Sequence, residues 1–469
     1  MSTLRQITKN AALLLVGSVS GQLVVLLCSP FLTRLYTPSD FGVFAVYTAC
    51  LYVFSSVATL RNEIAIPGAS SDSEAEILIV ACVYILACYT IFSTITSGIA
   101  AASIHANALA RYWYLLPIGI FLSGLYNVSM YARLRTSDHL VVSKTKFGQA
   151  VIGAVTQIGL AFTGAGPVGL IVGQILGVSG GVTRLMPLTS LIRNMSDVKI
   201  KQVCASIRKN RAYIKYDSPG ALLNIINNQF PAIAIAILYG AFAAGSYALV
   251  IRIILMPLSI VAASVSGSLI SSTRYLKNDE CGRVVRRISS LSILVSPVLV
   301  LVSLVCPLAF GFVFGAKWRG AGVVASWIGL MAAAKFSFDA VIIMLSAKGM
   351  QNFVLRIQSL LTVLRACVLI IGAKFLAFDE TIMAFSFVSA LTYSLSLWML
   401  QLKLEVKNTG KIIGVLANVL FSFLFIYCLY DHSVSHIATA MIGVAYIVGL
   451  YYQLPAAWRA VNNRHGEVL

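Results

Sequence analysis

The chain has 469 residues, of which 59% are hydrophobic and only 11% are charged, and its formal net charge is +19. A soluble core of this size cannot bury so much apolar surface, so most of the chain must be solvated by lipid. Cations facing the anionic inner leaflet account for the positive charge, and we therefore expect an all-α integral membrane protein with no nucleic-acid partner.

Polar clusters divide the sequence into about fourteen apolar stretches, each roughly 18–28 residues long and able to cross a bilayer. In chain order they cover 11–32, 43–60, 77–102, 113–132, 148–164, 167–188, 218–239, 243–271, 289–314, 322–346, 354–378, 380–401, 412–430 and 436–456. The first stretch contains no Ala-x-Ala cleavage site, which indicates a spanning helix rather than a signal peptide.

The loops between these stretches alternate between strongly basic and nearly neutral. With the N-terminus in the cytoplasm, the inside segments hold roughly 27 Lys and Arg residues and the outside segments about 5, as the positive-inside rule requires. An even number of crossings, with both termini cytoplasmic, follows from this asymmetry.

Cysteine and histidine usage indicates no metal and no disulfide framework. Most of the nine cysteines fall in apolar stretches, while Cys204 and Cys281 fall in predicted inside loops, where thiols stay reduced. No Cys-x-x-Cys pair occurs. His432 and His436 have a metal-like spacing but only Asp431 beside them, so we assign no metal site. No P-loop motif is present, and we predict no cofactor.

Two distant segments, 35–45 and 238–248, read alike: each contains Leu-Tyr, five residues, Gly, any residue, an aromatic residue and Ala. Each lies in the short outside link between the first and second stretch of a group of six. Because six is even, the two groups are parallel repeats related by an axis along the membrane normal, as in transporters that rock two bundles around a midplane site. Chance similarity between apolar sequences is the alternative.

This repeat divides the chain into four parts. They are an N-terminal six-helix bundle (1–188), a cytoplasmic basic linker (189–217), a C-terminal six-helix bundle (218–401) and an additional helix pair with a cytoplasmic tail (402–469).

Glycine recurs at every fourth position along the sixth stretch, at Gly169, Gly173, Gly177 and Gly181. Without side chains at these positions, a second helix can approach backbone to backbone. We interpret this ladder as a helix-packing surface.

Three cations fall well inside predicted helices of the second bundle: Arg252, Lys335 and Arg365. Each costs at least ~2.5–3.5 kcal/mol at the bilayer centre unless it faces protein or water, so such residues are candidates for function. Asp339 lies four residues after Lys335, so the two share a helix face and can pair. We predict that Arg252 and Arg365, supported by Lys335, bind substrate, and that Asp339 is a candidate ion-coupling residue; structural contacts between helices are the alternative.

Uncharged polar side chains accompany these cations. Asn224 and Asn228 share one helix stripe with Asp217, and we include both asparagines in the candidate binding site. We interpret Gln157 and Gln174 as amide contacts between helices.

A cationic, water-accessible chamber between two bundles suits a phosphate- or carboxylate-bearing substrate. The planar fork of arginine can grip a diphosphate through two parallel hydrogen bonds. An exporter of organic cations would instead place carboxylates and aromatic faces at the midplane.

Four segments carry a resemblance to a known family. Residues 32–42, Leu-Thr-Arg-Leu-Tyr-Thr-Pro-Ser-Asp-Phe-Gly, resemble the first outside link of the Wzx-type polysaccharide flippases of the multidrug/oligosaccharidyl-lipid/polysaccharide (MOP) exporter superfamily. Residues 60–67, 245–257 and 313–322 resemble the segment after helix two, the helix-eight signature and the link before helix ten. Asn62 stands where the family has an aromatic residue.

The resemblance implies a MATE-like fold that moves an undecaprenyl-diphosphate-linked oligosaccharide from the inner to the outer leaflet of the bacterial cytoplasmic membrane, for surface polysaccharide and O-antigen biosynthesis. The polyprenyl tail would stay in lipid while the diphosphate and sugars cross. The implied partners are this glycan lipid, membrane lipids, a polysaccharide polymerase and a chain-length regulator. Such a protein is a transporter and not an enzyme.

Two alternatives stay open. A flippase for the peptidoglycan lipid precursor belongs to the same class and differs in its headgroup. A membrane glycan polymerase or ligase has similar length and hydropathy, but such enzymes present a sizeable outward loop with catalytic Arg or His. The outward links of this chain are about ten residues or shorter, the usual size of plain connections.

Overall fold

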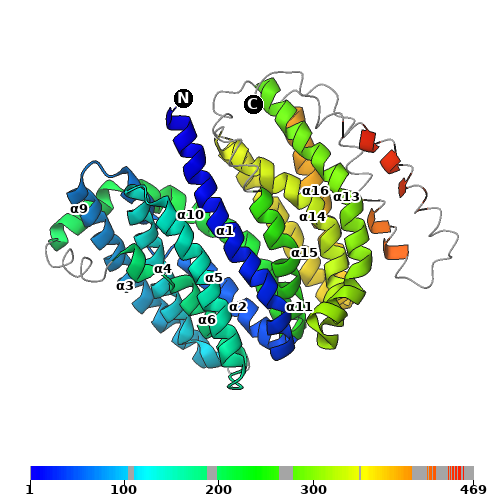
Figure 1. The fold of residues 1–469 in the computed structure, drawn as a ribbon, viewed down its shortest axis with the longest axis horizontal. Helices are drawn as coiled ribbons and strands as arrows, with labels where there is room; N and C mark the ends of the chain where they lie inside the picture. The colour runs from blue at the N-terminus through cyan, green and yellow to red at the C-terminus, as the bar shows by residue number, and fades with distance from the viewer. Residues whose placement is uncertain are drawn as a thin grey trace. The chain divides into compact units, whose positions relative to one another are not determined.

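The computed structural model describes residues 2–103, 110–186, 198–262, 278–347, 350–403 and scattered positions between 420 and 458. All regular elements in this part of the chain are helical (Figure 1). They are α1 (Ser2–Leu35), α2 (Pro38–Ser55), η1 (Asn62–Gly68), α3 (Asp72–Ser103), η2 (Ala110–Tyr112), α4 (Leu115–Arg135), α5 (His139–Ala161), α6 (Pro167–Ser179), α7 (Val182–Leu185), α9 (Ile200–Lys209), η3 (Tyr213–Asp217), α10 (Ser218–Tyr239), α11 (Ala241–Val250), η4 (Ile251–Leu255), α13 (Asn278–Phe314), η5 (Ala316–Trp318), α14 (Arg319–Ala347), α15 (Gln351–Phe375) and α16 (Phe378–Lys403).

Within the described ranges, ten helices are long and apolar enough to cross a membrane, so the chain is an all-α multi-pass membrane protein. Helices follow from the solvent, because a backbone in lipid must satisfy its own hydrogen bonds. The described residues of the first twelve predicted stretches lie mostly in helices, although 43–60 runs past the end of α2 and 167–188 contains the break between α6 and α7. The stretches 412–430 and 436–456 lie largely outside the described residues, so fourteen crossings and the location of both termini stay predictions.

The first link shows how local chemistry starts a helix. Thr37 is the N-cap of α2: its hydroxyl accepts from the Asp40 amide at 3.2 Å, and the Asp40 carboxylate accepts from the Thr37 amide at 2.9 Å. Such a capping box satisfies two amides that would otherwise have no partner at the helix end. Pro38 occupies the first turn, where a missing N–H costs nothing.

The chain forms two compact units, Met1–Ala248 and Leu249–Leu469. In unit 1, α5 packs between α1 and α6, α4 contacts α2, α3 and α6, and α10 packs against α2. In unit 2, α14 packs against α13 and α16, and 83% of its most apolar stretch is buried. The bundles 1–188 and 218–401 were predicted from the sequence repeat, whereas the two units are defined by packing. The division into these bundles stays a prediction.

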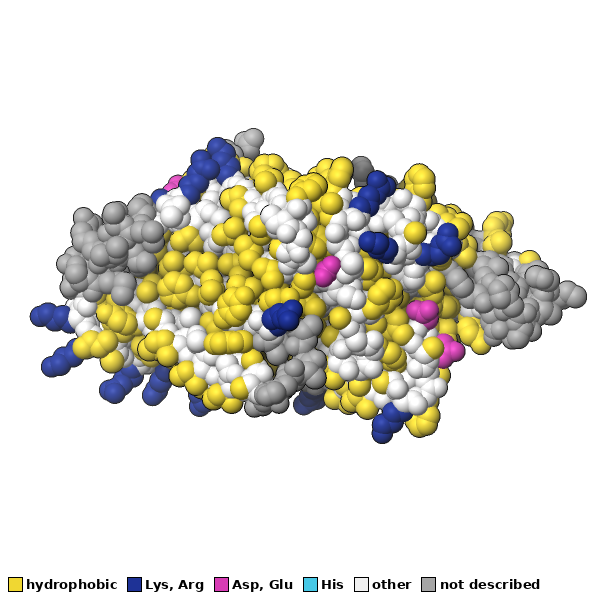
Figure 2. Space-filling model, turned by 90° about the horizontal axis from the view of Figure 1, so that it is seen from below, with side chains coloured by type: hydrophobic (Ala, Val, Ile, Leu, Met, Phe, Trp, Pro, Cys, Tyr) yellow, Lys and Arg dark blue, Asp and Glu magenta, His cyan; other side chains and the backbone are white. Residues whose placement is uncertain are grey.

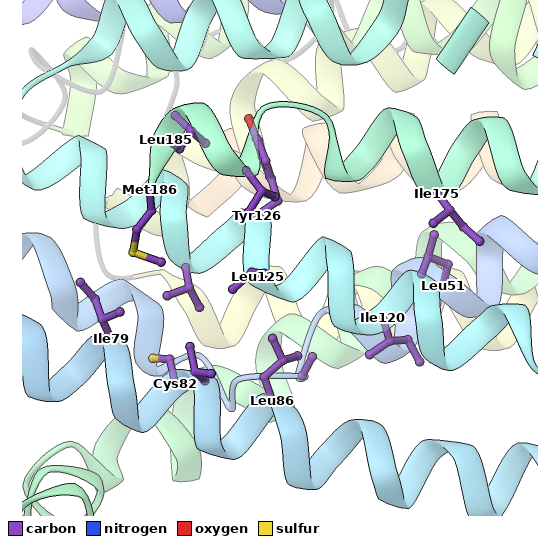
Figure 3. Packing of buried hydrophobic residues seen from close by; sticks show 14 of the residues in the cluster. Leu51, Ile79, Cys82, Leu86, Ile120, Leu125, Tyr126, Ile175, Leu185 and Met186 are labelled. Atoms are coloured by element: carbon purple, nitrogen blue, oxygen red, sulfur yellow. The ribbon is translucent and has the colours of Figure 1, made fainter. Parts of the chain in front are cut away.

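The core of unit 1 fills the space between α2, α3, α4, α6 and α7. Figure 3 shows side chains of this cluster, among them Leu51 of α2, Leu86 of α3 and Ile120 of α4. All three are almost fully buried. Burying a side chain of this size contributes about 1.5–3 kcal/mol in water, although in lipid close packing rather than water exclusion holds helices together.

Apolar side chains also cover the outside. Figure 2 shows a face rich in hydrophobic side chains, with Lys and Arg mainly toward its edges. Phe312 is 86% exposed and Phe162 and Phe375 are each 77% exposed. Large exposed apolar surfaces of this kind fit a hydrocarbon solvent.

Candidate functional site

Arg365 lies on α15 and is held by α16. Its Nε donates to Ser389 Oγ at 2.9 Å, and its Nη2 donates to the Tyr393 hydroxyl at 2.6 Å. The guanidinium also lies over the rings of Phe385 and Tyr393, with its carbon 5.1 and 5.3 Å from their centroids. These partners are all uncharged, and Arg365 is only 6% exposed. The charge is therefore stabilised by hydrogen bonds and aromatic faces.

Lys335 and Asp339 form an ion pair on α14, with 2.8 Å between Nζ and Oδ2. Their side chains are 18% and 26% exposed, so the pair is more accessible than Arg365. Lys335 Nζ also lies 5.8 Å from the centroid of the Tyr393 ring, the ring that Arg365 contacts from α15. The structure thus brings two cations and one carboxylate together around Tyr393.

Tyr393 is the residue that the sequence interpretation missed. It is 2% exposed, and it contacts Arg365 through its hydroxyl and both cations through its ring. An aromatic residue in an apolar stretch carries no distinguishing signal. Its spacing of four from Ser389 places both hydrogen-bonding side chains on one face of α16, which was the only hint available.

Arg252 and the two asparagines stand apart from this cluster in the chain. Arg252 is half-buried on η4, a π-helical turn that packs against α14. Wide turns of this type often mark functional positions. Asn224 and Asn228 are exposed on α10 in unit 1, and the Asn228 amide donates to the Asn224 carbonyl at 2.9 Å.

The two copies of the sequence repeat touch each other within unit 1. Gly42 of α2 lies against the backbone of Ala241, and Gly245 of α11 lies against the backbone of Pro38. Gly42 and Gly245 hold the same position in the two copies, as do Pro38 and Ala241. The contact is therefore reciprocal, as a two-fold relation requires. A Cβ atom at either glycine would overlap a carbonyl oxygen, so only glycine fits.

The glycine ladder divides between two elements. Gly169, Gly173 and Gly177 lie on α6, where Gly173 and Gly177 approach the backbone of Gly153 on α5. Gly181, which the sequence placed on the same helix, instead precedes α7 with φ 87°. The ladder is therefore not one continuous helix, because α6 ends at Ser179 and glycine adopts positive φ easily. Gly181 still lies against α5, where a Cβ atom would meet Thr145.

The corner after α2 is strained and polar. Leu60 and Arg61 have φ of 52° and 61°, which non-glycine residues rarely adopt. Thr59 donates to the buried Glu63 carboxylate, and Arg61 lies 3.8 Å from that carboxylate. Such strain costs about 1–3 kcal/mol per residue and persists only where packing fixes it. Here η1 is fixed by its contacts with α3 and α4.

Residues 31–322 match a family described as "polysaccharide biosynthesis protein". The chain belongs to this family. The match confirms the sequence resemblance to polysaccharide flippases of the MOP superfamily. No curated protein sequence matches the chain.

Solved structures give the fold. The lipid II flippase MurJ in an inward closed conformation superposes with a TM-score of 0.66 at 12% identity, over 96% of this chain and 99% of that one. A MATE protein in complex with MaL6 gives a TM-score of 0.52 at 14% identity, over 85% of this chain and 96% of that one. At these identities the likeness establishes a MurJ- and MATE-like fold and nothing about substrate.

Proposed function

We propose that this protein flips an undecaprenyl-diphosphate-linked oligosaccharide from the inner to the outer leaflet of the bacterial inner membrane, for surface polysaccharide such as O-antigen. The observation that carries the proposal is the cluster of Lys335 and Arg365 in apolar helices of a polysaccharide biosynthesis protein. Charge-assisted hydrogen bonds from such cations are the strongest contacts that a diphosphate can make in lipid surroundings. A cytoplasmic location of both termini belongs to the same proposal.

The geometry supports different roles for the residues of the cluster. Lys335 is the more accessible cation, so a diphosphate can replace Asp339 as its partner. The released Asp339 carboxylate can then take up a coupling ion. Arg365, held under Tyr393, adds the second positive charge from within the helix packing. We assign Arg252 to the same substrate and the exposed amides of Asn224 and Asn228 to sugar hydroxyls.

The reciprocal contact of Gly42 and Gly245 supports alternating access. In this proposal it closes the outer end of the transporter, because both copies of the repeat lie in links predicted to face outside. Separation of the two links then opens the path to the outer leaflet. The polyprenyl tail stays in lipid throughout.

Export of surface glycan in a transporter-null strain tests the site. Lys335→Ala and Arg365→Gln each remove a charge-assisted contact worth ~1.5–3 kcal/mol, so we expect export to fall roughly ten- to hundredfold at unchanged protein level in the membrane. Gln at 365 removes the charge and, although it is shorter than Arg, keeps a polar amide donor in place of the guanidinium. Lys374→Ala, which removes an exposed cation at the end of α15, is the control and should export normally. Normal export by the Lys335→Ala/Arg365→Gln double variant would end the proposal.

The peptidoglycan precursor is the competing substrate, and it shares the diphosphate. Complementation of a strain that lacks its own lipid II flippase separates the two. Growth of that strain when it expresses this chain would identify the peptidoglycan precursor, rather than the oligosaccharide, as the substrate.

A further inference from the structure

A short helix in the basic linker docks on the end of α3. In α9, Val203 is 2% exposed and packs with Val80 and Ala81 of α3. One turn and a half further along, Lys209 Nζ pairs with Glu74 Oε1 of α3 at 2.5 Å. Because 209 meets 74 and 203 meets 80, α9 runs antiparallel along α3. The helix is therefore fixed to unit 1.

The opposite side of α9 is basic and exposed. Lys201 and Arg208 lie seven residues apart, which places them on one stripe, and both are exposed. Lys199, Arg211 and Lys215 extend the positive surface beyond both ends of the helix. On the left of Figure 2, the side where Figure 1 shows α9, several Lys and Arg side chains project from the molecule.

Apolar side chains accompany these cations. Ile200 of α9 is 61% exposed, and Tyr216, next to Lys215, is 67% exposed. A helix that lies in a membrane interface shows this combination, with cations for headgroup phosphates and apolar side chains for the acyl boundary. A solvated cytoplasmic face would gain nothing from the exposed Ile200 and Tyr216 side chains.

We propose that the exposed face of α9, with its flanking cations, binds the phosphate headgroups of anionic phospholipids in the cytoplasmic leaflet. Charge complementarity indicates an anionic occupant for these exposed cations. Glu74, the acidic residue that α9 contacts on α3, is already paired with Lys209. The inference rests on the proposed cytoplasmic location of the linker and not on the identity of the glycan. Through the dock on α3, bound lipid holds this end of unit 1 at the membrane surface.

A fluorophore on α9 gives a local measurement. Cys204 is exposed on this helix, so the full chain can be labelled there after the exposed Cys88 and Cys367 are replaced by serine. The labelled protein is placed in phosphatidylcholine nanodiscs that contain nitroxide-labelled phosphatidylglycerol or nitroxide-labelled phosphatidylcholine. We expect nitroxide-labelled phosphatidylglycerol to quench the fluorophore at a clearly lower mole fraction than nitroxide-labelled phosphatidylcholine. When the label is on Cys367 of α15 instead, we expect the two lipids to quench it equally.

Charge variants then identify the contact. Lys201→Ser/Arg208→Ser should raise the mole fraction of phosphatidylglycerol needed for half-quenching on the order of tenfold. Lys317→Ser/Lys374→Ser removes two exposed positive charges elsewhere and should leave the mole fraction for half-quenching unchanged. Equal quenching by the two lipids at Cys204 would overturn the proposal. Preferential displacement by farnesyl diphosphate would also overturn it, since the face would then select a diphosphate rather than phospholipid.

Discussion

Replacing Gly42 by valine is expected to separate the two copies of the repeat. The new Cβ atom would meet the backbone of Ala241, which cannot yield as a flexible side chain would. Overpacking of this kind typically costs ~1–3 kcal/mol, which shifts the ratio of open to closed links by about 5- to 150-fold. Gly245→Val should act alike, because it meets Pro38 in the reciprocal contact. The double variant should add little to either single one, since both disrupt one interface.

Alkylation of a buried cysteine measures this opening. Ser246 is 3% exposed and lies beside Gly245, so Ser246→Cys is shielded while the links touch. When Gly42→Val is combined with Ser246→Cys, a membrane-impermeant maleimide applied to intact cells should alkylate the new cysteine faster. The rate should rise in proportion to the population with open links. Gly220→Val on α10, where a Cβ atom meets nothing within 4 Å, is the matched control. Unchanged alkylation in both Gly42→Val and Gly245→Val, or an equal increase in Gly220→Val, would refute the reasoning.

Three further predictions concern packing, the cation cluster and topology. Gly173→Leu should sharply lower the amount of folded protein, because its side chain would enter α5, whereas Gly159→Leu has open space and should accumulate normally; equal membrane levels on immunoblots would contradict this. Tyr393→Phe keeps the ring but removes the hydroxyl that accepts from the guanidinium, so glycan export should fall about tenfold at constant protein level, and unchanged export would exclude a role for this bond. Cys204 is exposed and should resist an impermeant thiol reagent applied outside cells, since labelling would place the linker outside; Cys281 is fully buried and cannot report on topology.

The sequence by itself indicated an apolar, helical membrane protein and the family to which it belongs. Hydropathy predicts spanning helices because lipid leaves the backbone no other way to satisfy its hydrogen bonds. The two Leu-Tyr repeats were also readable, as was the pairing of Lys335 with Asp339, because spacing along one helix fixes which side chains share a face. Such information depends on residues that are close in sequence, so it can be obtained without a structure.

Only the tertiary structure decided what lies opposite each of these faces. Arg365 reads in sequence as an uncompensated charge, but α16 brings Ser389, Phe385 and Tyr393 around it, and no spacing within α15 contains that pairing. Likewise, nothing in the two repeat copies says that Gly42 rests on Ala241. Contacts between helices depend on how whole surfaces pack, a property of many residues distant in sequence, and for that reason the neighbours of a buried residue become known only with the fold.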